Sequence, residues 1–161
     1  MLNILRGIQR PVQGQSMEIQ IKYLRRIPGV RRKSIERKIR KVLKDLACDK
    51  EELSVLFADD SMIADLNSRY LGRPGPTNVL AFPMSEDQDR GVASGMLGDV
   101  AISVDTAMRE SEENGEQIEE TICRLLIHGI LHLMGYNHEA VREERIMRKE
   151  EKRLISLVRE G

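Results

Sequence analysis

Four short stretches of the chain are apolar or alternate between apolar and polar residues, which is typical of β-strands. Between them, apolar residues recur every three or four positions, the spacing of helices with one buried face. The expected strands are residues 17–23, 53–57, 78–82 and 96–104, and the expected helices are about residues 34–46, 60–70, 105–114, 117–134 and 139–159. This order predicts an α/β (α+β) fold in which four strands and about five helices pack in layers.

Polar and small residues mark the ends of the expected helices. A side-chain oxygen at the start accepts a hydrogen bond from a free backbone N–H group, and a glycine after the last turn takes the left-handed conformation. The expected caps are Ser34, Asp60 or Ser61, and Asp105, and the expected stops are Gly115 and Gly135.

Two stretches fall outside the regular pattern. Residues 1–16 show no period and are expected to be a disordered N-terminal extension, followed by a single domain over residues 17–161. Residues 85–95 are polar and contain glycine, which predicts a mobile loop that could cover a binding site.

No apolar run approaches the roughly 20 residues that cross a bilayer, and residues 1–16 lack the apolar centre of a secretory signal. The two cysteines, Cys48 and Cys123, are too few for a disulfide framework. We therefore expect a cytoplasmic protein with no membrane partner.

The charge balance hides a strong asymmetry. The net charge is zero, yet residues 22–44 contain eleven Lys or Arg residues and one acid, Glu36, whereas residues 110–120 contain six glutamates. A basic stripe of this kind fits a phosphate-rich partner such as RNA, although a solvated helix face is the more common meaning of a charge run. Aromatic residues make up only 3% of the chain, which argues against a platform for stacking bases.

All three histidines lie within the segment His128-Gly-Ile-Leu-His132-Leu-Met-Gly-Tyr-Asn-His138. His128 and His132 are four residues apart and share one face of a helix, and Gly135 ends that helix so that His138 can return towards them. Packed, hydrogen-bonded histidines are the ordinary alternative. This helix is apolar on nearly every side, however, and a metal would satisfy both buried rings at once. Three imidazoles with one open position predict a catalytic zinc site.

Such a zinc lowers the pKa of bound water to about 7 and suits the hydrolysis of esters, amides or phosphodiesters. Nickel, copper or iron would also accept three imidazoles. Zinc proteases of the His-Glu-x-x-His type place a catalytic glutamate after the first histidine, and here that residue is Gly129. A peptidase is therefore the least favoured hydrolase. Cys123 lies five residues before His128 and points away from the ligand face, so we assign it to the core.

The histidine segment closely resembles the signature of the YbeY family, bacterial proteins of ribosomal RNA maturation and ribosome quality control. The resemblance extends from about Met17 to the last helix, and two further blocks of sequence are similar to that family. They are Leu66-Asn67 with Tyr70, Pro76-Thr77-Asn78-Val79-Leu80 and Phe82-Pro83, and then Leu97-Gly98-Asp99-Val100 with Ile102-Ser103.

This resemblance implies a single-domain fold with a four-stranded mixed sheet, and one Zn²⁺ per chain bound by His128, His132 and His138. It implies a single-strand-specific, metal-dependent endoribonuclease that matures the 3′ end of small-subunit rRNA and acts in ribosome quality control. The partners would be rRNA and the ribosomal small subunit, with no DNA expected. The alternative is a ribosome-associated zinc-binding factor with little catalytic activity of its own.

Three positions depart from the family pattern. Leu71 stands where the family usually has an arginine thought to serve substrate binding or catalysis, and a leucine cannot pair with a phosphate. Arg69 for substrate binding, or Arg73 for catalysis, could replace it, or both could be ordinary surface residues. Ala81 replaces a common serine, and Asn137 replaces an aspartate before the last histidine, which could weaken support for the metal site.

The remaining candidates have two readings each. Asp99 could be a general base or could orient a ligand, or it could satisfy backbone donors at a strand end. Thr77 and Asn78 could line the substrate cleft or form a turn. The sequence assigns no general base.

Overall fold

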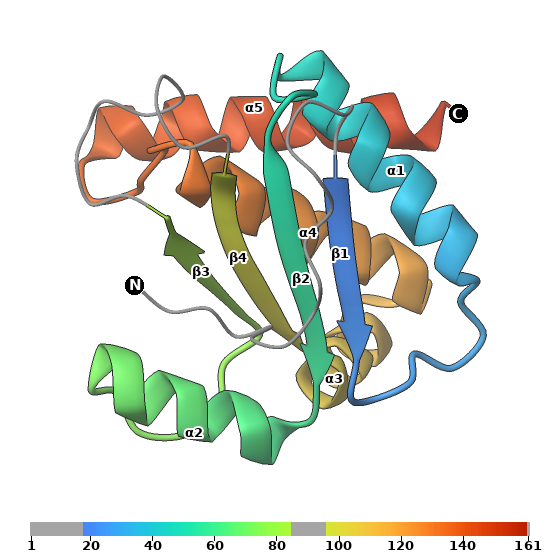
Figure 1. Ribbon diagram of the computed structural model, residues 1–161, viewed down its shortest axis with the longest axis vertical. Helices are drawn as coiled ribbons and strands as arrows, with labels where there is room; N and C mark the ends of the chain where they lie inside the picture. Colours follow the sequence, from blue (N-terminus) through green and yellow to red (C-terminus); the bar gives the residue numbers. More distant parts are fainter. Residues whose placement is uncertain (1–17, 85–95, 161) are drawn as a thin grey trace.

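The computed structural model describes residues 18–84 and 96–160 as a sheet with five helices (Figure 1). The expected N-terminal extension and the expected loop at residues 85–95 lie outside the described residues. The strands are β1 (Glu18–Tyr23), β2 (Glu52–Ala58), β3 (Val79–Pro83) and β4 (Met96–Ser103), and the helices are α1 (Arg32–Asp45), α2 (Asp60–Leu71), α3 (Val104–Asn114), α4 (Ile118–Leu133) and α5 (Val141–Arg159).

The strands form one mixed sheet in the order β1-β2-β4-β3. Strands β1, β2 and β4 run parallel, and β3 pairs antiparallel with β4 and lies at one edge. The predicted fold class is therefore confirmed, and each expected strand and helix is present to within a few residues at its ends.

Strict alternation divides the sheet into two faces. Val100 and Ile102 of β4 belong to the main core, whereas Ala101, between them, packs in a smaller cluster with Leu80 of β3 and Leu66 of α2. Helix α4 covers the first face, where it contacts β3 and β4, and α2 packs over the second. The sheet therefore has an α4 face and an α2 face.

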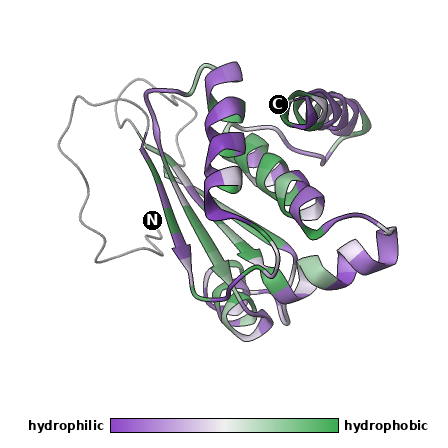
Figure 2. Cartoon of the chain, turned by 90° about the vertical axis from the view of Figure 1, so that its right-hand side faces the viewer, coloured by the Kyte–Doolittle hydropathy of each residue, from purple (hydrophilic) through white to green (hydrophobic). Residues whose placement is uncertain are grey.

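Helix α4 is the central helix of the domain. It is buried on most sides, and α5 and α1 pack against it from outside, so that α5 forms an outer layer away from the sheet. Figure 2 shows this arrangement, with hydrophobic colouring concentrated on the strands and hydrophilic colouring along much of α1. Gly129 allows the close approach of α4 to the sheet, since a Cβ there would lie 2.8 Å from Cγ1 of Val100.

The predicted cap of α1 is wrong. Helix α1 begins at Arg32 after Arg31, which makes no side-chain capping bond, and Ser34 lies in its first turn. The Ser34 hydroxyl donates instead to the carboxylate of Glu119 on α4. This tertiary contact ties α1 to α4 and takes the hydroxyl that the sequence pattern assigned to the cap.

The predicted caps of α2 and α3 are each displaced, because the expected aspartates make tertiary contacts. Asp59 caps α2 by accepting from the N–H of Met62, and Ser103 caps α3. Asp60 accepts from the Ser103 hydroxyl at 2.6 Å and from Arg109 at 2.8 Å, while Asp105 accepts from Arg25 at 3.2 Å. The stop at Gly115 is confirmed, with a φ of 64°.

Candidate metal centre

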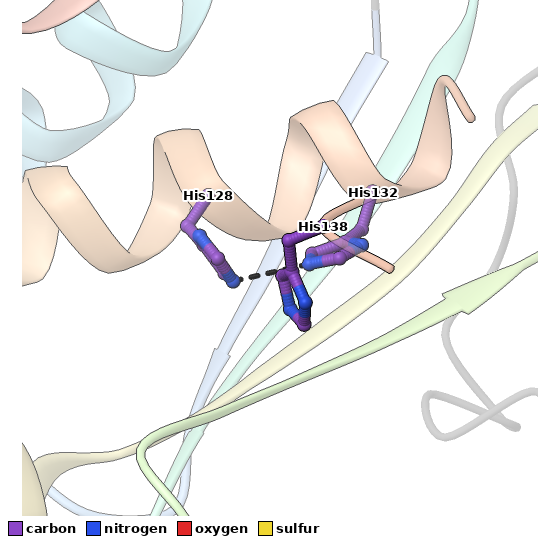
Figure 3. A group of neighbouring side chains, drawn as sticks. All are labelled: His128, His132 and His138. Carbon is purple, nitrogen blue, oxygen red and sulfur yellow. Dashed lines mark hydrogen bonds between the residues drawn. The ribbon is translucent and has the colours of Figure 1, made fainter. Parts of the chain in front are cut away.

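The three histidines converge from the end of α4 and the loop after it (Figure 3). Gly135 has a φ of 100°, and the turn is closed by hydrogen bonds from the N–H of Gly135 to the carbonyl of His132 and from the N–H of Tyr136 to that of Leu131, both 3.0 Å long. The turned chain brings His138 back to the face of α4 that carries His128 and His132, as the glycine stop predicts.

The distances within the triad suit a metal site. Nε2 of His128 lies 3.1 Å from Nε2 of His132, and one ligand atom from each of the three rings lies within 4.8 Å of the others. Two nitrogens bound to a tetrahedral zinc at 2.0–2.1 Å would be about 3.4 Å apart. The first two rings are therefore already at ligand spacing, and the donor set fits zinc. Cys123 is buried and takes no part in the group, as expected.

The surroundings of His132 favour its neutral imidazole form. Burial lowers the pKa of His132, and the neighbouring rings of His128 and His138 lower it further by charge repulsion. Smaller contributions from the charge of Glu151 and from a hydrogen bond with the backbone of Tyr136 raise this pKa. Nδ1 of His128 lies 2.6 Å from Oε1 of Glu151 on α5. A neutral imidazole offers the lone pair that a metal needs, so His132 is prepared to bind a cation.

A cleft of about 480 Å³ opens in front of the triad. Its lining comes from the end of α2 and the segment after it, from β3, from α4 and from the loop after α4. The residues that line it are Leu71, Arg73, Thr77, Asn78, Val79, Leu80, Ala81, Pro83, His128, Gly129, His132, Asn137, His138 and Glu139. This volume is typical of a site for a small ligand or a short segment of a larger one.

The family model described as "Endoribonuclease YbeY" matches residues 20–159 of the chain. The chain belongs to the YbeY family. It is 39% identical to the endoribonuclease YbeY of Syntrophus aciditrophicus over 94% of this chain and 96% of that protein. It is 43% identical to the endoribonuclease YbeY of Syntrophotalea carbinolica over 79% of this chain and 86% of that protein.

The fold has a counterpart among solved structures. The solution structure of a Thermotoga maritima protein matches with a TM-score of 0.61 at 24% identity, covering 87% of this chain and 88% of that one. Membership of the YbeY family makes this chain an endoribonuclease, a hydrolase that acts on RNA. Within the described ranges, none of the helices has the length and apolar character of a membrane span.

The structure separates the two arginines that could replace the expected YbeY arginine. Leu71 is 42% exposed and lines the cleft, and so does Arg73. Arg73 has no carboxylate partner among the described residues. Arg69 lies outside the cleft and pairs with Asp65 on its own helix at 3.2 Å. Arg73 is therefore the better placed of the two.

Two polar residues of the cleft already have internal partners. Nδ2 of Asn78 donates to Oε1 of Glu110 at 2.8 Å, and its side-chain Oδ1 accepts from the N–H of Val79 at 2.8 Å. Asn137 accepts from the N–H of Glu139 at 3.2 Å and thereby shapes the loop that carries His138. Asn78 thus fixes the start of β3, while Thr77 lines the cleft beside it.

Asp99 is placed away from the triad. It is 2% exposed and does not line the cleft. Along β4 it has the same parity as Ala101, so its side chain lies on the α2 face of the sheet, whereas the histidines lie on the α4 face. Asp99 therefore does not face the histidines, and its role stays a prediction.

Sequence reasoning missed two carboxylates near the triad. Glu139 is the one carboxylate among the described residues that line the cleft, and Glu151 contacts His128. A signal for Glu151 is present in the sequence, because it interrupts the apolar stripe that Met147, Leu154 and Val158 form on α5. A lone acid within a buried helix face indicates a buried partner.

Proposed function

We propose that this chain is a single-strand-specific endoribonuclease of late rRNA processing, which matures the 3′ end of small-subunit rRNA and contributes to ribosome quality control. In this proposal His128, His132 and His138 bind one Zn²⁺ per chain. The observation that supports it most directly is the convergence of three imidazoles at the floor of an open cleft in a YbeY-family chain.

The residues of the cleft divide the work of phosphodiester hydrolysis. When bound, a metal ion held by three imidazoles activates water near neutral pH and offsets negative charge on a phosphate. Arg73 binds a phosphate oxygen of the RNA and stabilises charge that develops there. Thr77 contacts the backbone of the strand, and β3 with Asn78 holds the wall against which that strand lies. The cleft has room for a short stretch of one strand, which supports the preference for unpaired RNA.

The partners follow from charge and compartment. The exposed cations of α1 attract the phosphate backbone of rRNA in the small subunit and bring it to the protein. Cys48 and Cys123 are both buried and unpaired, which supports a reducing, cytoplasmic setting.

A second candidate function rests on Leu71. An apolar side chain at the cleft, in the position expected for the YbeY arginine, is consistent with a ribosome-associated factor whose zinc is mainly structural. In that case removal of zinc would lower thermal stability and ribosome association, with no RNA turnover to lose.

Single-turnover cleavage of a single-stranded rRNA 3′-precursor fragment separates the two functions. The zinc-loaded protein should cut the fragment, and His132→Ala should lower the rate by at least about 100-fold, since removal of one metal ligand disables the site. Lys152→Ala, an exposed change on α5, is the matched control and should leave the rate unchanged. If the wild-type protein is silent, or if His132→Ala cuts equally well, the nuclease proposal fails for the isolated chain.

A further inference from the structure

We propose that Glu151 is a positioning residue for the metal centre, and that it holds His128 in the tautomer and orientation that bind the metal. This inference rests on the proposed metal-dependent function and extends it to a residue of a different helix. It assigns α5 a role in the site, because α5 supplies the carboxylate and α4 supplies the ring.

The geometry of the pair carries the argument. Oε1 of Glu151 lies 2.6 Å from Nδ1 of His128, a distance expected for a charge-assisted hydrogen bond. A carboxylate accepts, so Nδ1 carries the proton, and in the neutral imidazole Nε2 then carries the lone pair. It is Nε2 that lies 3.1 Å from Nε2 of His132, at the ligand spacing of a metal. The bond to Glu151 therefore selects the nitrogen that faces the site.

The pair is also fixed in place. The side chains of His128 and Glu151 are only 31% and 20% exposed. Met147 and Leu154, about one turn to either side of Glu151, are buried, so this face of α5 is held against the core. Within the described residues, His128 is the only ionic partner of Glu151, while the neighbouring Glu150 pairs with Arg153 instead. The Glu151 carboxylate therefore interacts with His128 and not with the neighbouring cations of α5.

Glu151 supports the site without being a ligand. Its oxygen contacts the far side of the His128 ring, and it does not belong to the group of ligand atoms that lie within 4.8 Å of one another. Partners that orient a ligand histidine typically contribute 10–100-fold in metal affinity, through tautomer, orientation and basicity. The same magnitude is expected here.

The test measures metal affinity and ring tautomer in the full chain. Zn²⁺ binding is followed by competition with a chromophoric chelator for the wild type, Glu151→Gln and Glu151→Ala. Glu120→Gln is the matched control, because Glu120 also joins α4 to α5, through Arg159 at 3.9 Å, and lies away from the triad. Imidazole ¹⁵N shifts of the metal-free protein report which nitrogen of His128 is protonated.

We expect Glu151→Ala to weaken Zn²⁺ binding by about 10–100-fold and to remove the preference for the Nδ1–H form of His128. Glu151→Gln has nearly the same volume and keeps an acceptor, so it should fold, retain part of that preference and lose about tenfold in affinity. The visible spectrum of the Co²⁺-substituted protein should change in both Glu151 variants and stay unchanged in Glu120→Gln.

Two results would overturn the inference. Affinity and tautomer within twofold of the wild type in both Glu151 variants would reduce Glu151 to a packing contact, while the proposed metal function would stand. Absence of Zn²⁺ binding in the wild type itself would remove both, and the chelator competition distinguishes this case from the first.

Discussion

The two edges of the sheet differ in how their polar and charged side chains are held. At the β3 edge, the cleft is built from segments far apart in the chain, and several of its polar groups are tied to internal partners. Helix α1 lies near β1 at the opposite edge (Figure 1), where Arg32 lies over the ring of Tyr23. The outer face of α1 carries several exposed cations, among them Lys33, Arg37 and Lys44. None of the residues that line the cleft belongs to α1.

The attraction of RNA and the cleavage step therefore depend on different parts of the molecule. Cleavage requires fixed distances between the groups of the cleft. Hydrogen bonds between side chains, such as those of Asn78 with Glu110 and of His128 with Glu151, help to fix them. The basic helix requires only exposed charge, which acts over about 8–10 Å at physiological salt. Changes at the β3 edge should therefore alter the cleavage step, and changes at the β1 edge should alter binding and its salt dependence.

Among changes at the two edges, replacement of Arg73 is expected to have the largest effect on RNA cleavage. Arg73→Ala should lower kcat/KM for single-stranded rRNA by about 100-fold, because a cation that stabilises developing charge is lost. Arg69→Ala is the matched control and should stay within twofold, since Arg69 is paired with Asp65 outside the cleft. The salt dependence of RNA binding should hardly change in either variant.

A double variant sharpens this test. Leu71 and Arg73 line the same cleft, so Leu71→Arg in the Arg73→Ala background should recover part of the lost rate. An equal loss for Arg69→Ala and Arg73→Ala would contradict the assignment of Arg73, and the binding-factor reading of Leu71 would gain support.

The features that the sequence predicts correctly are those encoded by residues close together in the chain. The spacing of His128, His132 and Gly135 encodes a helix face and its end, and the α4 segment and its turn follow that pattern closely. The alternation of strand residues likewise predicted the four strands, because a strand buried on one or both faces imposes its own period. Local geometry is sufficient for both features.

Contacts between residues that lie far apart in the sequence cannot be predicted from such local patterns. Asp60 and Asp105 have the composition of helix caps, yet each binds groups from other elements. Glu151 is thirteen residues beyond His138 and reaches the site only because α5 folds back along α4. No local rule specifies that return, so the orienting carboxylate and the wall of the cleft emerge only from the packed structure.

A smaller effect is expected at the β1 edge. Lys33 and Arg37 are exposed and one helical turn apart on α1. Their joint replacement by glutamine should reduce the slope of log affinity against log salt by about 1.4, at about 0.7 per lost phosphate contact with a single strand. The cleavage rate at saturating RNA should stay within twofold. Lys149→Gln with Lys152→Gln on α5 is the control, and equal slopes in all three proteins would identify the α1 run as a solvated face.

The smallest effect is expected in the pH dependence of stability, to which His132 at the cleft contributes and the cations of α1 do not. Burial, and then repulsion from His128 and His138, lowers the pKa of His132 below 6.5. The unfolded chain therefore binds more protons than the folded one, and the stability of the metal-free protein should fall as the pH drops below about 6.5 towards the lowered pKa. Thermal unfolding between about pH 5 and pH 7.5 should show this loss in the wild type and a reduced loss in His132→Gln. The variant with Lys33 and Arg37 replaced should keep the wild-type slope, because lysine and arginine do not titrate in that range. If stability falls with pH as steeply in His132→Gln as in the wild type, another group is responsible for the pH dependence.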